Sequence, residues 1–307
     1  MDGREQLLIT VTLLGTSALL PLPGRAETAA VLSCGGRSVL FDCGEGTQTA
    51  ARAAGVSLMK TDVVALTHYH GDHIFGLPGL CQTMSVLGRT EPLTVVGPGD
   101  VEKELEHIVG LMRPLSFELR LVPMPAEGME LGGGRLTAFE TAHRGISQGY
   151  RFDLPRAGRF LPERAAALHV PQRLWGVLQK GGTVEADGRV VRPEDVLGGS
   201  RRGLSVVFTG DTLACESVER AAHDADLLLC EATYGEDGQA ELAAQFGHMT
   251  FSEAGRLAAN AGARRLWLMH YSQMIKDPGG YLPNAQRYYP GAECGFDGKS
   301  VVLGFEE

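Results

Sequence analysis

Three histidines and an aspartate fall within six residues, directly after a short β-branched run. The segment TDVVALTHYHGDHIFGLPGL (residues 61–80) carries four side chains of metal-ligating type, His68, His70, Asp72 and His73. The run before them favours a strand, and Gly71 permits a tight turn through the cluster. A lone histidine would fit an ordinary structural role, but four such groups are costly to desolvate without partners. Imidazole nitrogen and carboxylate oxygen together suit Zn²⁺, with Mn²⁺ or Fe²⁺ as alternatives.

Three further residues of ligand type come just after predicted strands elsewhere in the chain: His143, Asp211 and His270. Such strand ends gather along one edge of a layered sheet, so we expect all seven residues to meet. Seven ligands exceed the roughly four that one zinc ion takes. They fit two ions about 3.5–4 Å apart that share a carboxylate and a hydroxide. Three other histidines are expected to be structural or at the surface: His107, His169 and His223.

Short β-branched runs alternate with helical patterns along the chain. Strands are predicted at Leu7–Leu13, Ala29–Leu32, Ser38–Phe41, Val63–Leu66, Leu93–Val96, Leu136–Thr141, Ser205–Phe208, Leu227–Leu229 and Leu266–Met269. Helices are predicted at Gly46–Ala54, Phe75–Leu87, Val101–Leu111, Leu213–Ala222 and Phe251–Ala261. The early strands follow one another through turns, whereas helices separate the later ones. This mixture predicts one α/β layered domain with mixed sheets over residues 1–307.

The composition is that of a globular chain, because 44% of the 307 residues are hydrophobic and 21% are charged. The net charge of -9 excludes a uniformly basic nucleic-acid binder but leaves room for a local basic patch. No run of about 18 apolar residues predicts a membrane span. The apolar stretch 7–24 resembles a signal-peptide core, but its flank is mixed in charge, with Asp2 and Glu5 beside Arg4, and its β-branched residues favour a strand. Six cysteines without a C-x-x-C pair are typical of reduced thiols, so we expect a cytoplasmic protein.

One segment, about residues 153–202, interrupts the alternation of strands and helices. It carries PRAGR, PER, KGG, RPED and GGSRR clusters between short apolar pieces, and we interpret it as an inserted arm or extended loop. From Arg151 to Arg202, ten arginines and lysines oppose six acids. The excess fits either a solvated loop or a surface for a polyanion.

The series His-x-His-x-Asp-His followed by distant His, Asp and His resembles the metallo-β-lactamase fold superfamily. Further motifs resemble those of one family within it, ribonuclease Z, the tRNA 3′-processing endonuclease. They are LGTSALLP (14–21), GR (24–25), LFDCGEGTQ (40–48), TAHRGISQGYR (141–151), FTGDT (208–212), CEATY (230–234) and GHMT (247–250). The resemblance runs from Leu14 to about Tyr271, which is most of the chain.

The resemblance implies a four-layer αβ/βα sandwich whose strand ends open on one metal-lined cleft. It implies two Zn²⁺ per subunit, the first held by His68, His70 and His143. The second would be held by Asp72, His73 and His270, with Asp211 bridging the two. The inserted segment would be the family's flexible arm, which grips precursor tRNA bound to the other subunit of a homodimer. Its predicted substrate contacts are Arg173 and Lys180.

Two positions depart from the family's pattern. VPQRLWGVLQKG (170–181) has Gln172 and Arg173 where the arm of this family carries a Gly-Pro pair. HYSQM (270–274) has Met274 where the family tends to have an arginine after the last metal histidine. The first departure concerns the tip that grips tRNA, and the second concerns a substrate contact near the cleft.

Phosphodiester hydrolysis needs a nucleophile, neutralisation of the phosphoryl charge and a proton for the leaving oxygen. A zinc pair supplies the first two, and the resemblance gives Asp72 the role of orienting the attacking water. Glu231 and His248 are not needed as ligands, yet a carboxylate beside an imidazole keeps it protonated. We therefore expect this pair to protonate O3′, which leaves a 3′-hydroxyl on tRNA and a 5′-phosphate on the trailer.

The leading hypothesis is a zinc-dependent endoribonuclease that removes 3′ trailers from precursor tRNA. The alternative is a dinuclear-metal phosphodiesterase for small cyclic or nucleotide phosphodiesters, which would not need the basic arm. A metal-binding scaffold without turnover predicts a gap in the ligands or in the proton donor, and no gap is present. Glu231, His248 and the arm disfavour a lactamase or thioester hydrolase.

Overall fold

The structure is a computed structural model that describes residues 8–305. It divides into two compact units. The body consists of Met1–Asp153 with Ser205–Glu307, and the arm consists of Leu154–Leu204. Leu7, the first residue of one predicted strand, lies outside the described residues. No helix between residues 8 and 305 is long and apolar enough to cross a membrane.

The first sheet of the body has seven strands in the order β16-β1-β2-β3-β4-β5-β6. They are β16 (Ser300–Leu303), β1 (Ile9–Gly15), β2 (Ala29–Cys34), β3 (Arg37–Phe41), β4 (Thr61–Ala65), β5 (Leu93–Gly97) and β6 (Leu119–Pro123). β2 and β3 form a hairpin through Gly35 and Gly36, which both have positive φ as a tight two-residue turn requires. From β3 to β6 the pairing is parallel. β4 is buried at four of its five residues, as expected of a parallel strand covered on both faces.

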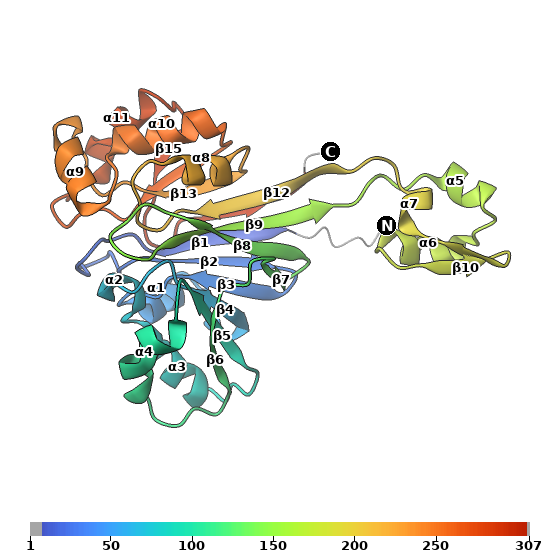
Figure 1. Cartoon of the computed structure of the whole chain (residues 1–307), viewed down its shortest axis with the longest axis horizontal. Coiled ribbons are helices and arrows are strands. Elements are labelled where there is room, and N and C mark those ends of the chain that lie inside the picture. The colour runs from blue at the N-terminus through green and yellow to red at the C-terminus, as the bar shows by residue number, and fades with distance from the viewer. Residues whose placement is uncertain (1–7, 306–307) are drawn as a thin grey trace. The chain divides into compact units, whose positions relative to one another are not determined.

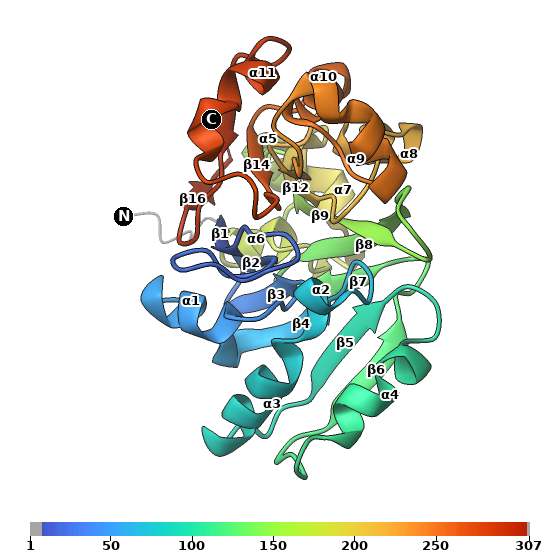
Figure 2. The ribbon, with the colours of Figure 1, turned by 90° about the vertical axis from the view of Figure 1, so that its left-hand side faces the viewer.

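Helices α1 (Thr47–Ala53), α3 (Leu77–Val86) and α4 (Val101–Gly110) accompany the first sheet (Figure 2). Their apolar side chains form one cluster with strand residues, in which Leu80 and Leu105 join Leu40, Val64 and Val95. The predicted helix Phe75–Leu87 begins later, at Leu77, because the chain first forms the short α2 (Gly71–Ile74). The 3-10 turn η1 (Leu58–Lys60) leads into β4.

The second sheet has the order β15-β14-β13-β12-β9-β8-β7. Its strands are β7 (Met129–Leu131), β8 (Gly134–Glu140), β9 (Gln148–Arg156), β12 (Arg201–Phe208), β13 (Leu227–Glu231), β14 (Leu266–Met269) and β15 (Ala292–Cys294). The accompanying helices are α8 (Glu216–Ala222), α9 (Ala240–Phe246), α10 (Phe251–Ala261) and α11 (Leu282–Gln286), with 3-10 turns η2 (Asp237–Gln239) and η3 (Pro278–Gly280). α10 starts at a Thr250–Glu253 capping box and stops at Gly262, which has positive φ. The predicted helix Leu213–Ala222 starts three residues late, at Glu216.

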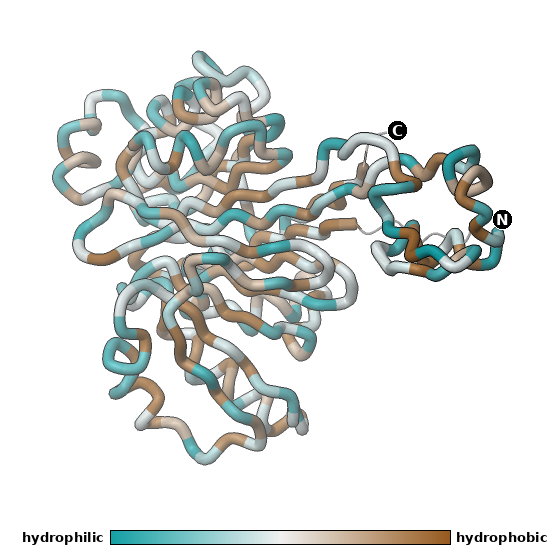
Figure 3. The backbone as a smooth tube through the Cα atoms, turned by 45° about the vertical axis from the view of Figure 1, so that its right-hand side comes forward, coloured by the Kyte–Doolittle hydropathy of each residue, from teal (hydrophilic) through white to brown (hydrophobic). Residues whose placement is uncertain are grey.

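The two sheets pack face to face in the body. Phe41 of the first sheet stacks on Phe208 of the second with ring centroids 5.2 Å apart, and Tyr150 of the second lies 6.0 Å from Phe41. The buried Tyr150 hydroxyl donates to the carbonyl of Leu66 across the layers at 2.7 Å. Figure 1 shows helices outside both sheets, and Figure 3 shows apolar segments concentrated along the strands. The predicted four-layer αβ/βα sandwich is confirmed.

The arm has secondary structure and an apolar core of its own. It contains α5 (Pro162–Ala167), α6 (Gln172–Gln179), α7 (Pro193–Val196) and the hairpin β10 (Val184–Ala186)–β11 (Arg189–Val191). Ala165, Leu178 and Val196 are fully buried there, and the rings of Phe160 and Trp175 lie 5.2 Å apart beside them. Of the two interpretations of this segment, an inserted arm or an extended loop, its secondary structure and separate core favour the inserted arm. Its charged clusters fall at turns and helix starts, and the short apolar pieces between them form the core.

Candidate metal centre

The His68–His73 segment leaves β4 and turns into α2. His70 is the last extended residue before this helix, and the helix itself carries Asp72 and His73. His143 follows β8, Asp211 follows β12 and His270 follows β14. Gly210 lets the chain after β12 come close to Thr67, because a Cβ at this position would lie only 2.6 Å from Thr67 Cγ2. The structure thus brings all seven predicted ligand residues to one place in the body.

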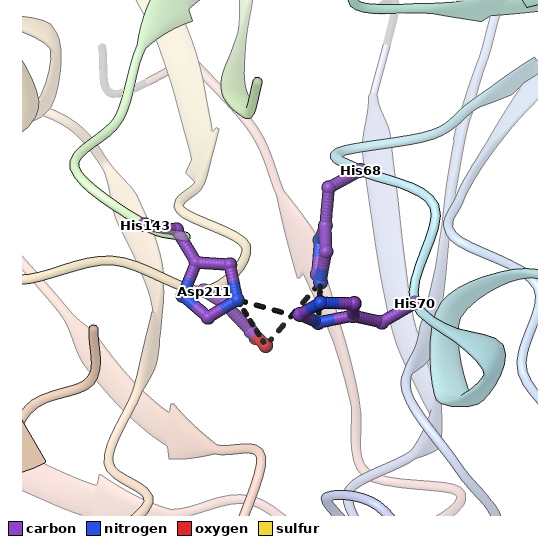
Figure 4. Close-up of side chains that lie close together, drawn as sticks. All are labelled: His68, His70, His143 and Asp211. Carbon is purple, nitrogen blue, oxygen red and sulfur yellow. Dashed lines mark hydrogen bonds and ion pairs between the residues drawn. The ribbon is translucent and has the colours of Figure 1, made fainter. Parts of the chain in front are cut away.

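The first cluster consists of His68, His70, His143 and Asp211, whose ligand atoms lie within 4.8 Å of one another (Figure 4). His68 Nε2 lies 2.9 Å from His70 Nδ1 and 3.6 Å from Asp211 Oδ2. His143 Nε2 lies 3.3 Å from His70 Nδ1. Convergence of three imidazole nitrogens and a carboxylate is the donor set of a transition-metal site.

The second cluster consists of Asp72, His73 and His270. The Nε2 atoms of His73 and His270 lie 3.6 Å and 3.5 Å from Asp72 Oδ2. The same two nitrogens lie 3.3 Å and 3.1 Å from the carboxylate oxygens of Asp211. These nitrogens and Asp211 Oδ1 are buried polar atoms without a hydrogen-bond partner among the described residues. Asp211 faces both clusters, as a bridging ligand would.

The electrostatic environment of the cluster favours a bound cation. Burial lowers the pKa of His68 well below its ordinary value, so this imidazole is neutral and able to ligate. Burial alone would raise the pKa of Asp211, but His270 and His73 outweigh it and hold that pKa well below its ordinary value. Burial would likewise lower the pKa of His73, yet Asp211, Asp42 and Asp72 raise it well above the ordinary value. Three carboxylates around one imidazole create a negative potential that a metal ion would neutralise.

Hydrogen bonds from the opposite ring nitrogens fix the orientation of the histidines. His73 Nδ1 contacts Asp42 Oδ2 at 2.8 Å, and His143 Nδ1 contacts the carbonyl of Gly247 at 2.9 Å. His68 Nδ1 contacts the hydroxyl of Thr67 at 3.0 Å, and that hydroxyl donates to Asp42 at 2.9 Å. These contacts place the N–H on Nδ1 and leave Nε2 free to ligate.

His270 repeats the arrangement on the second sheet. Its Nδ1 contacts the hydroxyl of Thr233 at 2.9 Å, and that hydroxyl donates to Glu231 at 2.8 Å. Asp42 and Glu231 are thus the two buried carboxylates that orient histidines of the two sheets. Asp42 was not among the predicted site residues, although its position directly after β3, in the LFDCGEGTQ motif, was the available signal.

Asp72 is held from outside the histidine segment. Its Oδ2 accepts a hydrogen bond of 2.7 Å from the backbone N–H of Leu19. Leu19 has φ 64°, a left-handed conformation that costs free energy for a leucine. The LGTSALLP motif therefore supplies a backbone donor that fixes the carboxylate of Asp72.

Glu231 and His248 form a buried ion pair beside the metal ligands. His248 Nδ1 donates to Glu231 Oε1 at 3.0 Å. Glu231 is 1% exposed and also accepts hydrogen bonds from the backbone N–H groups of Thr212 and Met249. Burial would lower the pKa of His248, but Glu231 raises it to about 9. His248 is therefore protonated at neutral pH, and its side chain keeps 15% exposure.

His248 and five of the seven ligand-type residues line one open cavity of about 610 Å³. Its wall includes His70, Asp72, His143, Asp211, His248 and His270. Arg173 and Lys180 are exposed residues of the arm, in and directly after α6. The three histidines expected outside the site, His107, His169 and His223, are all exposed.

The sandwich fold and the two ligand clusters together are those of a metal-dependent hydrolase. A model of the metallo-beta-lactamase superfamily matches residues 23–247, and the chain belongs to this superfamily. Relatives named ribonuclease Z occur in Agathobacter rectalis and Lachnoclostridium phytofermentans, with 40% and 41% identity over 98% of this chain and 100% and 99% of theirs. The crystal structure of human tRNase Z, short form, aligns with a TM-score of 0.66 and 25% identity, over 95% of this chain and 98% of that one. Within the superfamily, the chain is a member of the ribonuclease Z family.

Proposed function

We propose that this protein is a metal-dependent endoribonuclease that removes 3′ trailers from precursor tRNA. Family membership supports the substrate, because relatives of full length and about 40% identity are named ribonuclease Z. The observation that carries the proposal is the protonated His248 held by Glu231 beside seven metal-ligating side chains. A leaving-group acid next to two ligand clusters is what phosphodiester hydrolysis needs.

The cofactor we propose is a pair of Zn²⁺ ions per subunit. His68, His70 and His143 would hold one ion, Asp72, His73 and His270 the other, and Asp211 would bridge them. Two bound ions supply a water acidified to a pKa of about 7 and neutralise charge on the phosphoryl oxygens. Mixed imidazole and carboxylate donors support zinc, and Mn²⁺ or Fe²⁺ would also accept this set.

The chain's own residues carry the proton transfers. Asp72, fixed by the N–H of Leu19, orients the attacking water and accepts its proton. The water oxygen bonds to phosphorus as the bond from phosphorus to O3′ breaks. His248 gives its proton to O3′, and Glu231 stabilises the protonated imidazole until that transfer. The products are tRNA with a 3′-hydroxyl and a trailer with a 5′-phosphate.

We propose further that the protein acts as a cytoplasmic homodimer whose arm grips the tRNA. The folded arm and its exposed Arg173 and Lys180 support a role in binding a polyanion. The described cysteines are free, which fits a reducing compartment.

The test is cleavage of a precursor tRNA that carries a defined 3′ trailer. We expect one cut at the trailer junction, with a 3′-hydroxyl on the tRNA and a 5′-phosphate on the released trailer. End mapping by ligation and mass spectrometry reads both ends. Hydrolysis of bis(p-nitrophenyl) phosphate without any cut in precursor tRNA would instead favour a small-molecule phosphodiesterase.

A further inference from the structure

The cavity at the metal centre carries a single permanent cation. Among the described residues that line it, Arg144 is the only arginine or lysine. Glu27, Asp72 and Asp211 also line it, and all three are acidic. On the side that follows His270, the wall is formed by the uncharged Ser272 and Gln273. A polyanionic strand entering this cavity would therefore meet one side-chain positive charge besides His248.

Arg144 is held firmly although it is exposed. Its guanidinium lies over the ring of Phe246, with Cζ 4.7 Å from the ring centroid. Its Nη2 donates to the carbonyl of Gln245 at 2.9 Å. Next to it, His143 Nδ1 contacts the carbonyl of Gly247. The segment 143–144 is thus attached to the end of α9 by two hydrogen bonds and a cation–π contact, which pre-orders the guanidinium.

The charge of Arg144 acts on the cavity. Tyr234 lines the same wall, and although burial raises the pKa of its hydroxyl, the positive charge of Arg144 opposes that rise. A guanidinium has five N–H donors in a planar fork, and the carbonyl of Gln245 accepts from one of them. The remaining donors match the oxygens of a phosphate.

We propose that Arg144 binds a backbone phosphate of the RNA next to the cleaved linkage, with Phe246 holding the guanidinium in place. This inference rests on the proposed function, because it names a substrate contact of the same site. Because the metal ligands are shared by hydrolases of many substrates, Arg144 would help to select a substrate with a flanking phosphate over a single ester.

A purely structural role makes a different prediction. Arg144 would then only cap the last carbonyls of α9, where a cation is favourable. Its removal would loosen the wall and weaken RNA binding equally at every salt concentration. The dependence of affinity on salt therefore separates the two roles, since only a lost phosphate contact changes the number of released counterions.

The experiment measures binding to the metal-loaded protein by fluorescence anisotropy across a series of KCl concentrations. The probe is an acceptor-stem minihelix RNA with a single-stranded 3′ extension, in which a phosphonate blocks the scissile linkage. For Arg144→Gln we expect about tenfold weaker binding at low salt. We also expect the slope of log K against log salt to become shallower by about 0.7. Arg144→Lys keeps the charge, so it should keep the slope while losing part of the affinity.

A second series replaces single linkages beside the scissile one by uncharged methylphosphonates. In the wild type one linkage should cost about tenfold in affinity, whereas in Arg144→Gln the same linkage should cost almost nothing. Arg52→Gln is the matched control, because Arg52 is exposed on α1 and lies outside the cavity. It should leave both the salt slope and the linkage pattern unchanged.

Equal salt slopes for wild type and Arg144→Gln, or the same methylphosphonate costs in both proteins, would overturn the inference. Thermal unfolding of each variant shows whether it is folded, and Arg144→Lys supplies the comparison if Arg144→Gln is not. The salt slopes and the methylphosphonate costs are measured by binding and do not require cleavage. A wild type that binds the RNA but never cuts it would contradict the proposed function and leave the assignment of Arg144 to be decided by the slopes.

Discussion

Asp211 belongs to the first ligand cluster and also lies next to two histidines of the second. Its carboxylate oxygens lie within 4.0 Å of nitrogen atoms from His68, His73, His143 and His270. Asp211→Asn should therefore lower the metal content from about two ions per chain to fewer than one, because both sites lose an anionic ligand. Elemental analysis of the purified protein measures this. His223→Ala, which removes an exposed histidine, is the control and should keep the full metal content.

Asp42 is fully buried, and it orients His73 directly and His68 through Thr67. Asp42→Asn should weaken metal binding by about 10–100-fold while the fold survives, since a second-layer partner tunes ligands without replacing them. Competition with a chelator measures the affinity. Unchanged affinity would show that the imidazoles are positioned by packing alone.

His248 and Glu231 should control the alkaline side of the pH profile. The pKa of His248 is raised to about 9, so its acid form is present at neutral pH and the rate should fall as pH rises through about 9. Glu231→Gln removes the carboxylate that raises this pKa, so the fall should move to lower pH. His248→Ala should lower kcat by about 10²–10⁴-fold and abolish this limb, with precursor affinity largely kept. If the rate of His248→Ala still falls as pH rises through about 9, the group that protonates the leaving oxygen is not His248.

The convergence of the candidate ligand residues was predictable from sequence, because they lie in one short cluster and at three strand ends. Asp42 and Leu19 were not assigned roles, because their contacts join segments 25 to 53 residues apart. Arg144 carried no signal of its own, since only the structure shows that it lies over Phe246.

Among the elements, strongly β-branched strands and long amphipathic helices were predicted to within a few residues. β9 was missed, because QGYRFDLPR mixes charged residues with its buried Tyr150, Phe152 and Leu154. The helices of the arm were missed for a related reason. They are short, and their apolar faces pack on one another inside the arm. No single segment is therefore long enough to show the hydrophobic periodicity of a helix.

Deletion of residues 155–200 tests the arm as an element. The arm has its own buried cluster, so its removal should leave the sandwich folded. Cleavage of precursor tRNA should be abolished, whereas hydrolysis of bis(p-nitrophenyl) phosphate should persist. If both activities survive, the arm has no part in RNA binding.

A milder change in the arm is Arg173→Ala. It should weaken precursor binding in a salt-sensitive way, because the exposed guanidinium of Arg173 would lose a phosphate partner. Binding measured at two salt concentrations checks this, and an effect of equal size at both would argue for a packing role.

At the scale of the whole molecule, the sandwich explains why ligands distant in sequence meet. β4, β8, β12 and β14 come from two sheets, and each ends at the edge where the ligands converge. The layered class was predictable from the order of strands and helices. The antiparallel β8–β9 pairing and the stacking of Phe41 on Phe208 were not, since they depend on contacts that the sequence does not show.

Two strands, β9 and β12, connect the body to the arm, and a candidate metal ligand lies next to the body end of each strand. His143 lies shortly before the first residue of β9, and Asp211 lies shortly after the last residue of β12. The strand β12 is about 26 Å long, because each residue of a strand adds about 3.3 Å. A change of the arm, whether by insertion, deletion or exchange, would therefore start several residues away from any candidate metal ligand. Lineages that inherit this scaffold could retarget the nuclease to a different RNA by grafting a new tip, without rebuilding the hydrolytic centre.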